Sequence, residues 1–360
     1  MRSPRRRISN GICAQSERLN KSGIGRINYL PMPKPSRNTY HQGPPSPHFD
    51  GVRFRIPGHY ALKTLRDVLR WRLKNPWTRW PEFLPVTPDE PPALVEGASL
   101  RVSFIGQATM LIQTQGLNIL TDPFFSLRAS PVQWAGPKRT RAPGVALEKL
   151  PKIDLVLLSH NHYDHMDLPA LKAIHAAHQP LILTPLGNGA ILHKAKRALH
   201  VREMDLYEDH AFGGIKITLT PARHWSRRTT RDTNHALWGA FVLQTQAGLI
   251  YFAGDTGYGD GEHFREIRAR FGPPRLALLP IGAYEPRWFM KDQHMDPAEA
   301  VQAHLDLGAA RSLAMHHATI QLTGEAIDAP TRELEKARAL KGVSEDDFPA
   351  PWPGGHVYFD

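Results

Sequence analysis

The sequence contains a single cysteine among 360 residues and has no long apolar run. Cys13 has no partner for an intrachain disulfide, which excludes a disulfide framework and favours a reducing compartment. The longest apolar stretches, such as Ile153–Leu158, have the length of a buried strand and fall short of the roughly 18 residues of a membrane span. We therefore expect a cytoplasmic globular protein with no transmembrane segment.

Acidic residues are scarce in the first fifty residues, where Glu17 and Asp50 face a large excess of arginine and lysine. Much of the net charge of +11 therefore lies in this leader, and we interpret residues 1–47 as a disordered, solvated basic tail. No apolar stretch of about 7–15 residues follows the first arginines, so a secretory signal is not predicted, while a transit peptide stays open. Such a tail would attract a polyanion or an anionic lipid surface, but we find no recognisable nucleic-acid-binding motif and expect no nucleic-acid partner.

Residues 48–95 are expected to form an N-terminal extension. Between Ala61 and Lys74, four leucines recur with helical spacing: Leu62, Leu65, Leu69 and Leu73. This pattern predicts an amphipathic helix that ends before Pro76. We expect the leucine stripe to pack on the main domain; the alternative is peripheral contact with a lipid interface, together with the nearby Trp71, Trp77 and Trp80. A proline-rich connector, Pro81–Pro92, leads into the catalytic domain, residues 96–360.

Strand and helix patterns alternate through this last domain, which predicts an α/β (α+β) fold. We predict strands over Leu100–Ile105, Thr109–Thr114, Leu117–Thr121, Leu155–Ser159, Leu181–Thr184, Ile215–Thr220, Ala240–Leu243, Leu249–Phe252, Leu276–Leu279 and Ser312–Met315. We predict helices over Leu168–His178, His263–Phe271, Pro297–Leu307 and Pro330–Leu340.

Metal-ligand residue types follow four of these strands. Within a few residues of the strand that ends near Ser159 come His160, His162, Asp164 and His165. Three later strands lead to His224, Asp255 and His316. Imidazole and carboxylate groups are good zinc ligands, and strand ends at one sheet edge can hold them rigidly. We predict that these seven residues bind two metal ions, with His317 as the alternative to His316.

The spacing His160-x-His162-x-Asp164-His165, with Gly254-Asp255 and the later His316, resembles the metallo-β-lactamase superfamily. The resemblance implies a four-layer αββα sandwich that carries two Zn²⁺ at one edge of its sheets. It implies His160, His162 and His224 on one zinc, Asp164, His165 and His316 on the other, and Asp255 between them.

Further strings resemble the N-acylphosphatidylethanolamine-hydrolysing phospholipase D family. They include Ile119-Leu-Thr-Asp-Pro-Phe, Gly136-Pro-Lys-Arg and Ile281-Gly-Ala-Tyr-Glu-Pro-Arg. His317-Ala318 stands where that family usually has Trp-Gly, which puts the lipid selectivity in question. The resemblance implies a phospholipid substrate and a homodimer.

We therefore expect a zinc-dependent phosphodiesterase that cleaves N-acylphosphatidylethanolamine into N-acylethanolamine and phosphatidate through a metal-bridging hydroxide. Asp164 and Asp255 would act within the metal set, and His294 would protonate the leaving oxygen or bind phosphate, unless it is a structural histidine. Asp167 is expected to orient a ligand imidazole. The alternatives are a hydrolase of a sugar-phosphate lactone or nucleic-acid phosphodiester with the same metals, and a metal-binding scaffold without catalysis.

Overall fold

The structure is a computed structural model that describes residues 37–56, 63–74 and 77–359. The predicted tail up to residue 36 lies outside these residues. Order reaches back beyond the boundary predicted at residue 47, because Asn38 is buried. Its side-chain amide donates to the carbonyl oxygens of Val52 (2.6 Å) and His235 (2.9 Å), so this segment packs on the domain.

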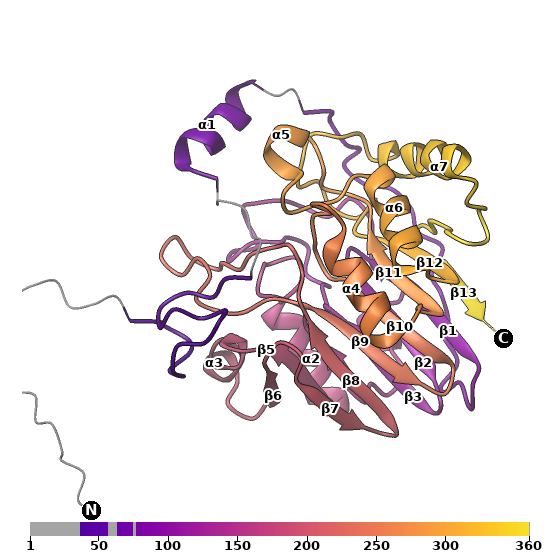
Figure 1. Ribbon diagram of the computed structural model, residues 1–360, viewed down its shortest axis with the longest axis horizontal. Helices are drawn as coiled ribbons and strands as arrows, with labels where there is room; N and C mark the ends of the chain where they lie inside the picture. The colour runs from indigo at the N-terminus through magenta and orange to yellow at the C-terminus, as the bar shows by residue number, and fades with distance from the viewer. Residues whose placement is uncertain (1–36, 57–62, 75–76, 360) are drawn as a thin grey trace, which may run out of the picture. The chain divides into compact units, whose positions relative to one another are not determined.

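Two sheets form the centre of the domain (Figure 1). The seven-stranded sheet has the order β13-β1-β2-β3-β4-β5-β6, with β13 His356–Phe359, β1 Leu100–Gly106, β2 Thr109–Thr114, β3 Leu117–Thr121, β4 Leu155–Leu157, β5 Leu181–Pro185 and β6 His200–Met204. The six-stranded sheet has the order β12-β11-β10-β9-β8-β7, with β12 Arg311–Met315, β11 Leu276–Pro280, β10 Gly248–Phe252, β9 Ala240–Thr245, β8 Ile215–Thr220 and β7 Asp209–Phe212.

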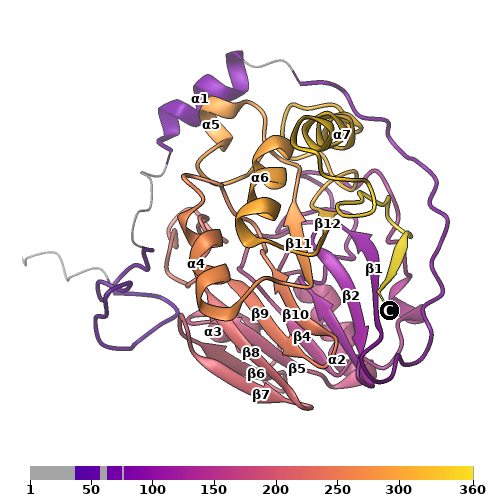
Figure 2. The same cartoon turned by 45° about the vertical axis from the view of Figure 1, so that its right-hand side comes forward.

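Helices cover the outer faces of the two sheets (Figure 2). The first sheet packs on α2 (Leu168–His178) and α3 (Asn188–Ala195), and the second on α4 (Glu262–Phe271), α6 (Pro297–Leu307) and α7 (Ala329–Lys341). Short helices complete the set: η1 (Leu147–Lys149) and α5 (Arg287–Met290). The predicted αββα sandwich is confirmed.

Side-chain alternation along the strands explains this layering. In β4, Leu155 and Leu157 join the large core between the sheets, whereas Val156 joins a second core with Leu171 and Ile174 of α2. A strand sends successive side chains to opposite faces, so a strand covered on both faces is apolar at every position. Every residue of β4 is indeed buried.

The predicted amphipathic helix is present as α1 (Leu65–Lys74), but its orientation differs from the expectation. Leu69 and Leu73 are 53% and 84% exposed. The contact with the domain is made instead by Trp71, whose ring stacks on Phe289 with centroids 5.0 Å apart. For these two leucines, the predicted packing on the domain was therefore wrong, whereas Leu62 and the Leu65 side chain lie outside the described part of the structure. In the parts of the chain that are described, none of the helices combines the length and apolarity needed to cross a bilayer.

Candidate metal centre

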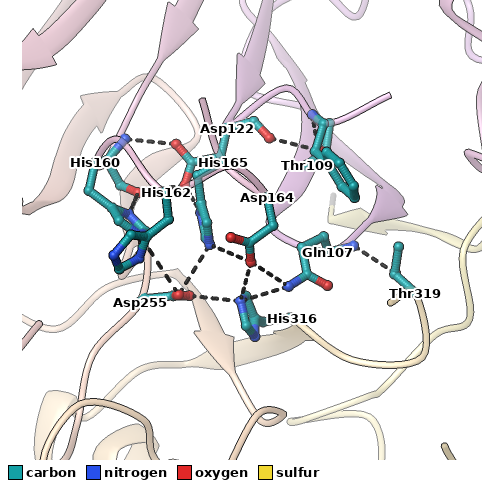
Figure 3. Close-up of polar contacts among 12 residues, drawn as sticks. Gln107, Thr109, Asp122, His160, His162, Asp164, His165, Asp255, His316 and Thr319 are labelled. Carbon is teal, nitrogen blue, oxygen red and sulfur yellow. Dashed lines mark hydrogen bonds and ion pairs between the residues drawn. The ribbon is translucent and has the colours of Figure 1, made fainter. Parts of the chain in front are cut away.

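Four strands end at one edge of the two sheets and deliver the predicted donors there. β4 leads into the loop 158–167, which carries four of them, and β8, β10 and β12 lead to His224, Asp255 and His316. The structure thus brings together all seven residues predicted as ligands. Figure 3 labels all of them except His224. The structure divides the seven residues into two groups whose donor atoms lie within 4.8 Å of one another: His160, His162 and His224, and Asp164, His165, Asp255 and His316.

Hydrogen bonds select the nitrogen that each imidazole of the first group turns to the centre. His224 Nδ1 lies 3.1 Å from the carbonyl oxygen of Gln293, to which it can only donate. His160 Nδ1 lies 2.9 Å from Ser159 Oγ, which already donates its own proton to Asp122. Both rings therefore keep an unprotonated Nε2, and these atoms lie 3.1 and 2.9 Å from His162 Nδ1.

The second group surrounds the carboxylate of Asp255. His165 Nε2 lies 3.1 Å from Asp255 Oδ2, and His316 Nε2 lies 3.2 Å from Asp255 Oδ1. The same two nitrogens lie 3.3 and 3.4 Å from Asp164 Oδ2. Asp255 also faces the first group, because its Oδ2 is 3.9 Å from His160 Nε2 and 3.7 Å from His224 Nε2. Asp255 is thus placed between the two groups.

The distances of 3.1–3.4 Å within the second group are close to those between donors that converge on one cation, and the distances of 2.9 and 3.1 Å in the first group are somewhat shorter. Two ligands of one tetrahedral zinc, each about 2.0–2.2 Å from the metal, lie roughly 3.3–3.5 Å apart. Burial, together with neighbouring imidazoles, lowers the pKa of His160 and His162 far below the usual value, and burial lowers that of His224 to about 4. The first group therefore offers neutral imidazoles at neutral pH.

The second group favours positive charge. Burial alone would lower the pKa of His165 and His316, but Asp255 and Asp164 outweigh it and raise the pKa of His165 well above normal and that of His316 to about 9. Burial would likewise raise the pKa of Asp255, yet His165 and His316 hold it well below normal. Without a metal, protons supply the positive charge that the carboxylates require, and a cation would displace them.

Asp122 at the end of β3 holds His165 directly and His160 through the Ser159 hydroxyl. Its Oδ2 accepts from His165 Nδ1 (2.6 Å) and from Ser159 Oγ (2.5 Å). This role was assigned to Asp167 from the sequence, and that interpretation is wrong. The Asp167 side chain instead accepts from the backbone nitrogens of Phe125 and Ser126, and caps α2.

Gln107 is a second residue that the sequence analysis missed. It lies in the tight turn between β1 and β2 with φ +58°, and its Nε2 donates to Asp164 Oδ2 at 2.9 Å and lies 2.8 Å from His316 Nε2. A lone polar residue in a turn gives no ligand pattern. Asp122, in contrast, stands inside the string Ile119-Leu-Thr-Asp-Pro-Phe that carried the resemblance.

His294 lies beside the first group. One of its ring nitrogens is within 4.8 Å of the donor atoms of His224 and Asp255, and burial lowers its pKa to about 3. His317, in contrast, is separate from both groups: its buried ring stacks on Phe104, with centroids 5.1 Å apart. The geometry thus places His316, rather than its neighbour, among the donors.

Comparisons with known proteins agree with this geometry. The model of the beta-lactamase superfamily domain matches residues 117–317, more than half of the chain and the stretch that contains all seven donors. The chain belongs to the metallo-β-lactamase superfamily. It resembles the N-acyl-phosphatidylethanolamine-hydrolyzing phospholipase D members of this superfamily.

Three relatives illustrate the superfamily match. The chain is 39% identical over 231 residues to N-acyl-phosphatidylethanolamine-hydrolyzing phospholipase D 1 of Caenorhabditis elegans, covering 62% of this chain and 65% of that protein. It is 37% identical over 249 residues to the mitochondrial yeast enzyme of that name (Saccharomyces cerevisiae), covering 68% of this chain and 53% of the relative. It is 36% identical to the uncharacterized protein Rv0906 of Mycobacterium tuberculosis over 73% of this chain and 69% of that one. The chain thus matches less than two thirds of either phospholipase.

Solved structures share the fold. A possible metal-dependent hydrolase from Veillonella parvula superposes with a TM-score of 0.57 at 17% identity, covering 71% of this chain and 98% of that one. CmlA, a diiron β-hydroxylase from Streptomyces venezuelae, superposes with a TM-score of 0.51 at 18% identity, covering 76% of this chain and 54% of that one. At these identities the likeness establishes the fold alone.

Proposed function

We propose that this protein is a zinc-dependent phosphodiesterase of the phospholipase D type, which hydrolyses N-acylphosphatidylethanolamine to N-acylethanolamine and phosphatidate. The observation that carries the proposal is the 39% identity over 231 residues to the Caenorhabditis elegans phospholipase. The donor arrangement supports it, because two adjacent groups of donors that share one carboxylate suit two divalent cations.

The residues present fit such a pair of cations. His160, His162 and His224 would hold one, Asp164, His165 and His316 the other, and Asp255 would contact both. When bound, two cations polarise a phosphoryl oxygen and lower the pKa of water. Imidazole-rich donors with carboxylates favour zinc, and such a donor set also admits other divalent cations.

The chain's own residues orient the reacting groups. Gln107 fixes one oxygen of Asp164, and Asp122 fixes the ring of His165, so both donors are preorganised. The lowered pKa of His294 keeps its imidazole neutral at physiological pH. A neutral imidazole can donate an N–H to a phosphoryl oxygen, which favours phosphate binding over protonation of the leaving group.

Arg287 stabilises the loop that carries His294. It donates to the carbonyl oxygen of His294 (3.0 Å), and its guanidinium pairs with Glu299 (2.6 Å) and Asp296 (3.2 Å). Since both carboxylates already engage this guanidinium, we assign Arg287 to positioning of the His294 loop.

The test is a substrate panel on the zinc-loaded protein. We expect vesicles that contain N-acylphosphatidylethanolamine to yield N-acylethanolamine and phosphatidate, and ¹⁸O from labelled water to enter the phosphatidate, because water attacks phosphorus. A sugar-phosphate lactone and single-stranded DNA should remain intact. Turnover of either of these with intact N-acylphosphatidylethanolamine would refute the substrate assignment and leave the metal-dependent hydrolase.

A further inference from the structure

Helix α1 contacts the domain through one side. Trp71 stacks nearly parallel on Phe289 of α5, with an interplanar angle of 11°, and also contacts Trp77 with ring centroids 5.4 Å apart. Just before the helix, Lys63 pairs with Asp292 at 2.9 Å. Both Figure 1 and Figure 2 show α1 beside α5.

The exposed side of α1 combines leucines with cations. An α-helix turns by about 100° per residue, so Leu69 and Leu73 lie roughly 160° around the axis from Trp71. Both leucines are exposed. The same stripe, at helical spacings of three and four, also carries three exposed cations, and we call these five residues the outer face of α1: Arg66, Leu69, Arg70, Leu73 and Lys74.

Two exposed tryptophans lie next to the outer face of α1. Exposed Trp77 follows the helix, and exposed Trp288 lies next to it, with the Arg70 guanidinium 4.9 Å from the Trp288 ring centroid. The acidic residue of the helix, Asp67, is held at the helix start, where its carboxylate accepts from the backbone nitrogen (2.8 Å) and the hydroxyl (2.7 Å) of Thr64. The outer face itself is purely cationic and apolar.

Residues 292–294 link this surface to the metal centre. Asp292, the partner of Lys63, directly precedes Gln293 and His294. The carbonyl oxygen of Gln293 accepts from His224 Nδ1 at 3.1 Å. The segment 292–293 therefore makes two contacts: it pairs with Lys63 just before α1, and it accepts a hydrogen bond from His224, a donor of the first group.

We propose that the outer face of α1, with Trp77 and Trp288, docks on a bilayer that contains anionic phospholipid. Leucines would enter the boundary of the acyl chains, tryptophans would lie at headgroup depth, and the cations would pair with lipid phosphates. The charge complementarity selects an anionic bilayer as the occupant of this face. The inference concerns the approach to the membrane and stands apart from the proposed reaction, so its test uses vesicles without substrate.

The single cysteine permits a local probe. In a Cys13→Ser background, an environment-sensitive fluorophore is attached to Leu73→Cys or, as the control, to Leu340→Cys on α7, where the native leucine is 85% exposed. On phosphatidylcholine vesicles with about 30% phosphatidylglycerol, we expect a blue shift for the probe on α1 and none for the probe on α7.

Two results would overturn the proposal. Vesicle binding with no shift of either probe would mean that the basic tail alone binds the membrane. A shift of the α1 probe before vesicles are added, together with a dimeric mass, would mean that a second copy of the chain covers this face.

Affinity measurements separate the contributions of the leucines and of the cations on the outer face of α1. We expect Leu69→Gln/Leu73→Gln to weaken vesicle binding roughly tenfold or more. Arg66→Gln/Arg70→Gln should weaken it about 30-fold at low salt, on anionic vesicles only. Unchanged metal content and circular dichroism would show that the variants are folded. Unchanged affinity of both folded variants would contradict the assignment of this face.

Discussion

At the scale of single residues, the centre depends on groups that do not themselves bind metal. Asp122 is fully buried. One of its carboxylate oxygens, Oδ2, accepts from both His165 and the Ser159 hydroxyl that lies against His160. One aspartate thus sets the tautomer of a donor in each group. Such outer contacts typically contribute 10–100-fold to metal affinity.

Replacement of Asp122 tests this dependence. We expect Asp122→Ala to weaken zinc binding about 10–100-fold, because His165 loses its hydrogen bond to this carboxylate and the Ser159 hydroxyl beside His160 loses its acceptor. The matched control is Asp167→Ala, whose carboxylate caps α2 and contacts no site imidazole among the described hydrogen bonds. Competition with a zinc chelator measures both. Equal affinities of the two variants would contradict the assigned role of Asp122.

Protonation of the second group makes metal binding depend on pH. Since the pKa of His316 rises to about 9 and that of His165 rises well above normal, both rings are protonated in the metal-free chain at pH 7.5. Their raised pKa stabilises the metal-free fold fully below the usual histidine pKa, and this stability is lost as the pH rises through about 9.

Metal loading at pH 7.5 should therefore release protons. We expect about two protons per chain from these rings, and metal affinity that increases with pH up to about 9. Isothermal titration with zinc in two buffers of different ionisation enthalpy counts the protons. A binding enthalpy that is independent of the buffer would exclude the proposed protonation.

At the scale of elements, the site depends on close packing between the ends of β11 and β12. A Cβ added to Gly282, just beyond β11, would lie 2.1 Å from the carbonyl oxygen of His316. Since this contact is with backbone, a larger residue must move the loop that carries His316. The glycine permits the approach of the two strand ends.

Gly282→Ala should therefore displace His316 and lower the zinc content while costing about 1–3 kcal/mol in the free energy of unfolding. Gly272→Ala, where a Cβ meets no atom within 4 Å but φ is +91°, is a control for backbone strain alone. Metal analysis and chemical denaturation compare the two. Full zinc content in the first variant would show that the loop tolerates the shift.

The elements also show what the sequence can predict. The interior strands and α2 and α6 are where they were predicted, because apolar runs and proline or aspartate caps mark them. The strands β6, β7 and β13 were missed because these half-exposed edge strands are short and have no strong apolar pattern. The leucine spacing predicted α1 but not its docked face, since one stacked tryptophan decides the orientation.

At the scale of the whole molecule, the predicted donors either lie close together in the sequence or follow the ends of apolar strands. Their convergence could therefore be predicted. Asp122 and Gln107 could not be assigned in this way, because the β1–β2 turn and the end of β3 reach the centre only through the fold. The N-terminal extension is joined to the sheet by the buried pair of Asp89 and Arg101, at 2.5 Å, which no local pattern indicates.

The most direct measurement is metal content and turnover of N-acylphosphatidylethanolamine vesicles on the same samples of the parent protein and Asp255→Asn. Asp154→Asn, at the opposite end of β4 from the donors, is the control. We predict about two zinc ions per chain with turnover in the parent and control. Asp255→Asn should lose metal and at least about a thousandfold in rate, or about 4 kcal/mol of barrier. A parent chain that binds no metal, or full zinc content and turnover in Asp255→Asn, would contradict a two-metal centre that depends on Asp255.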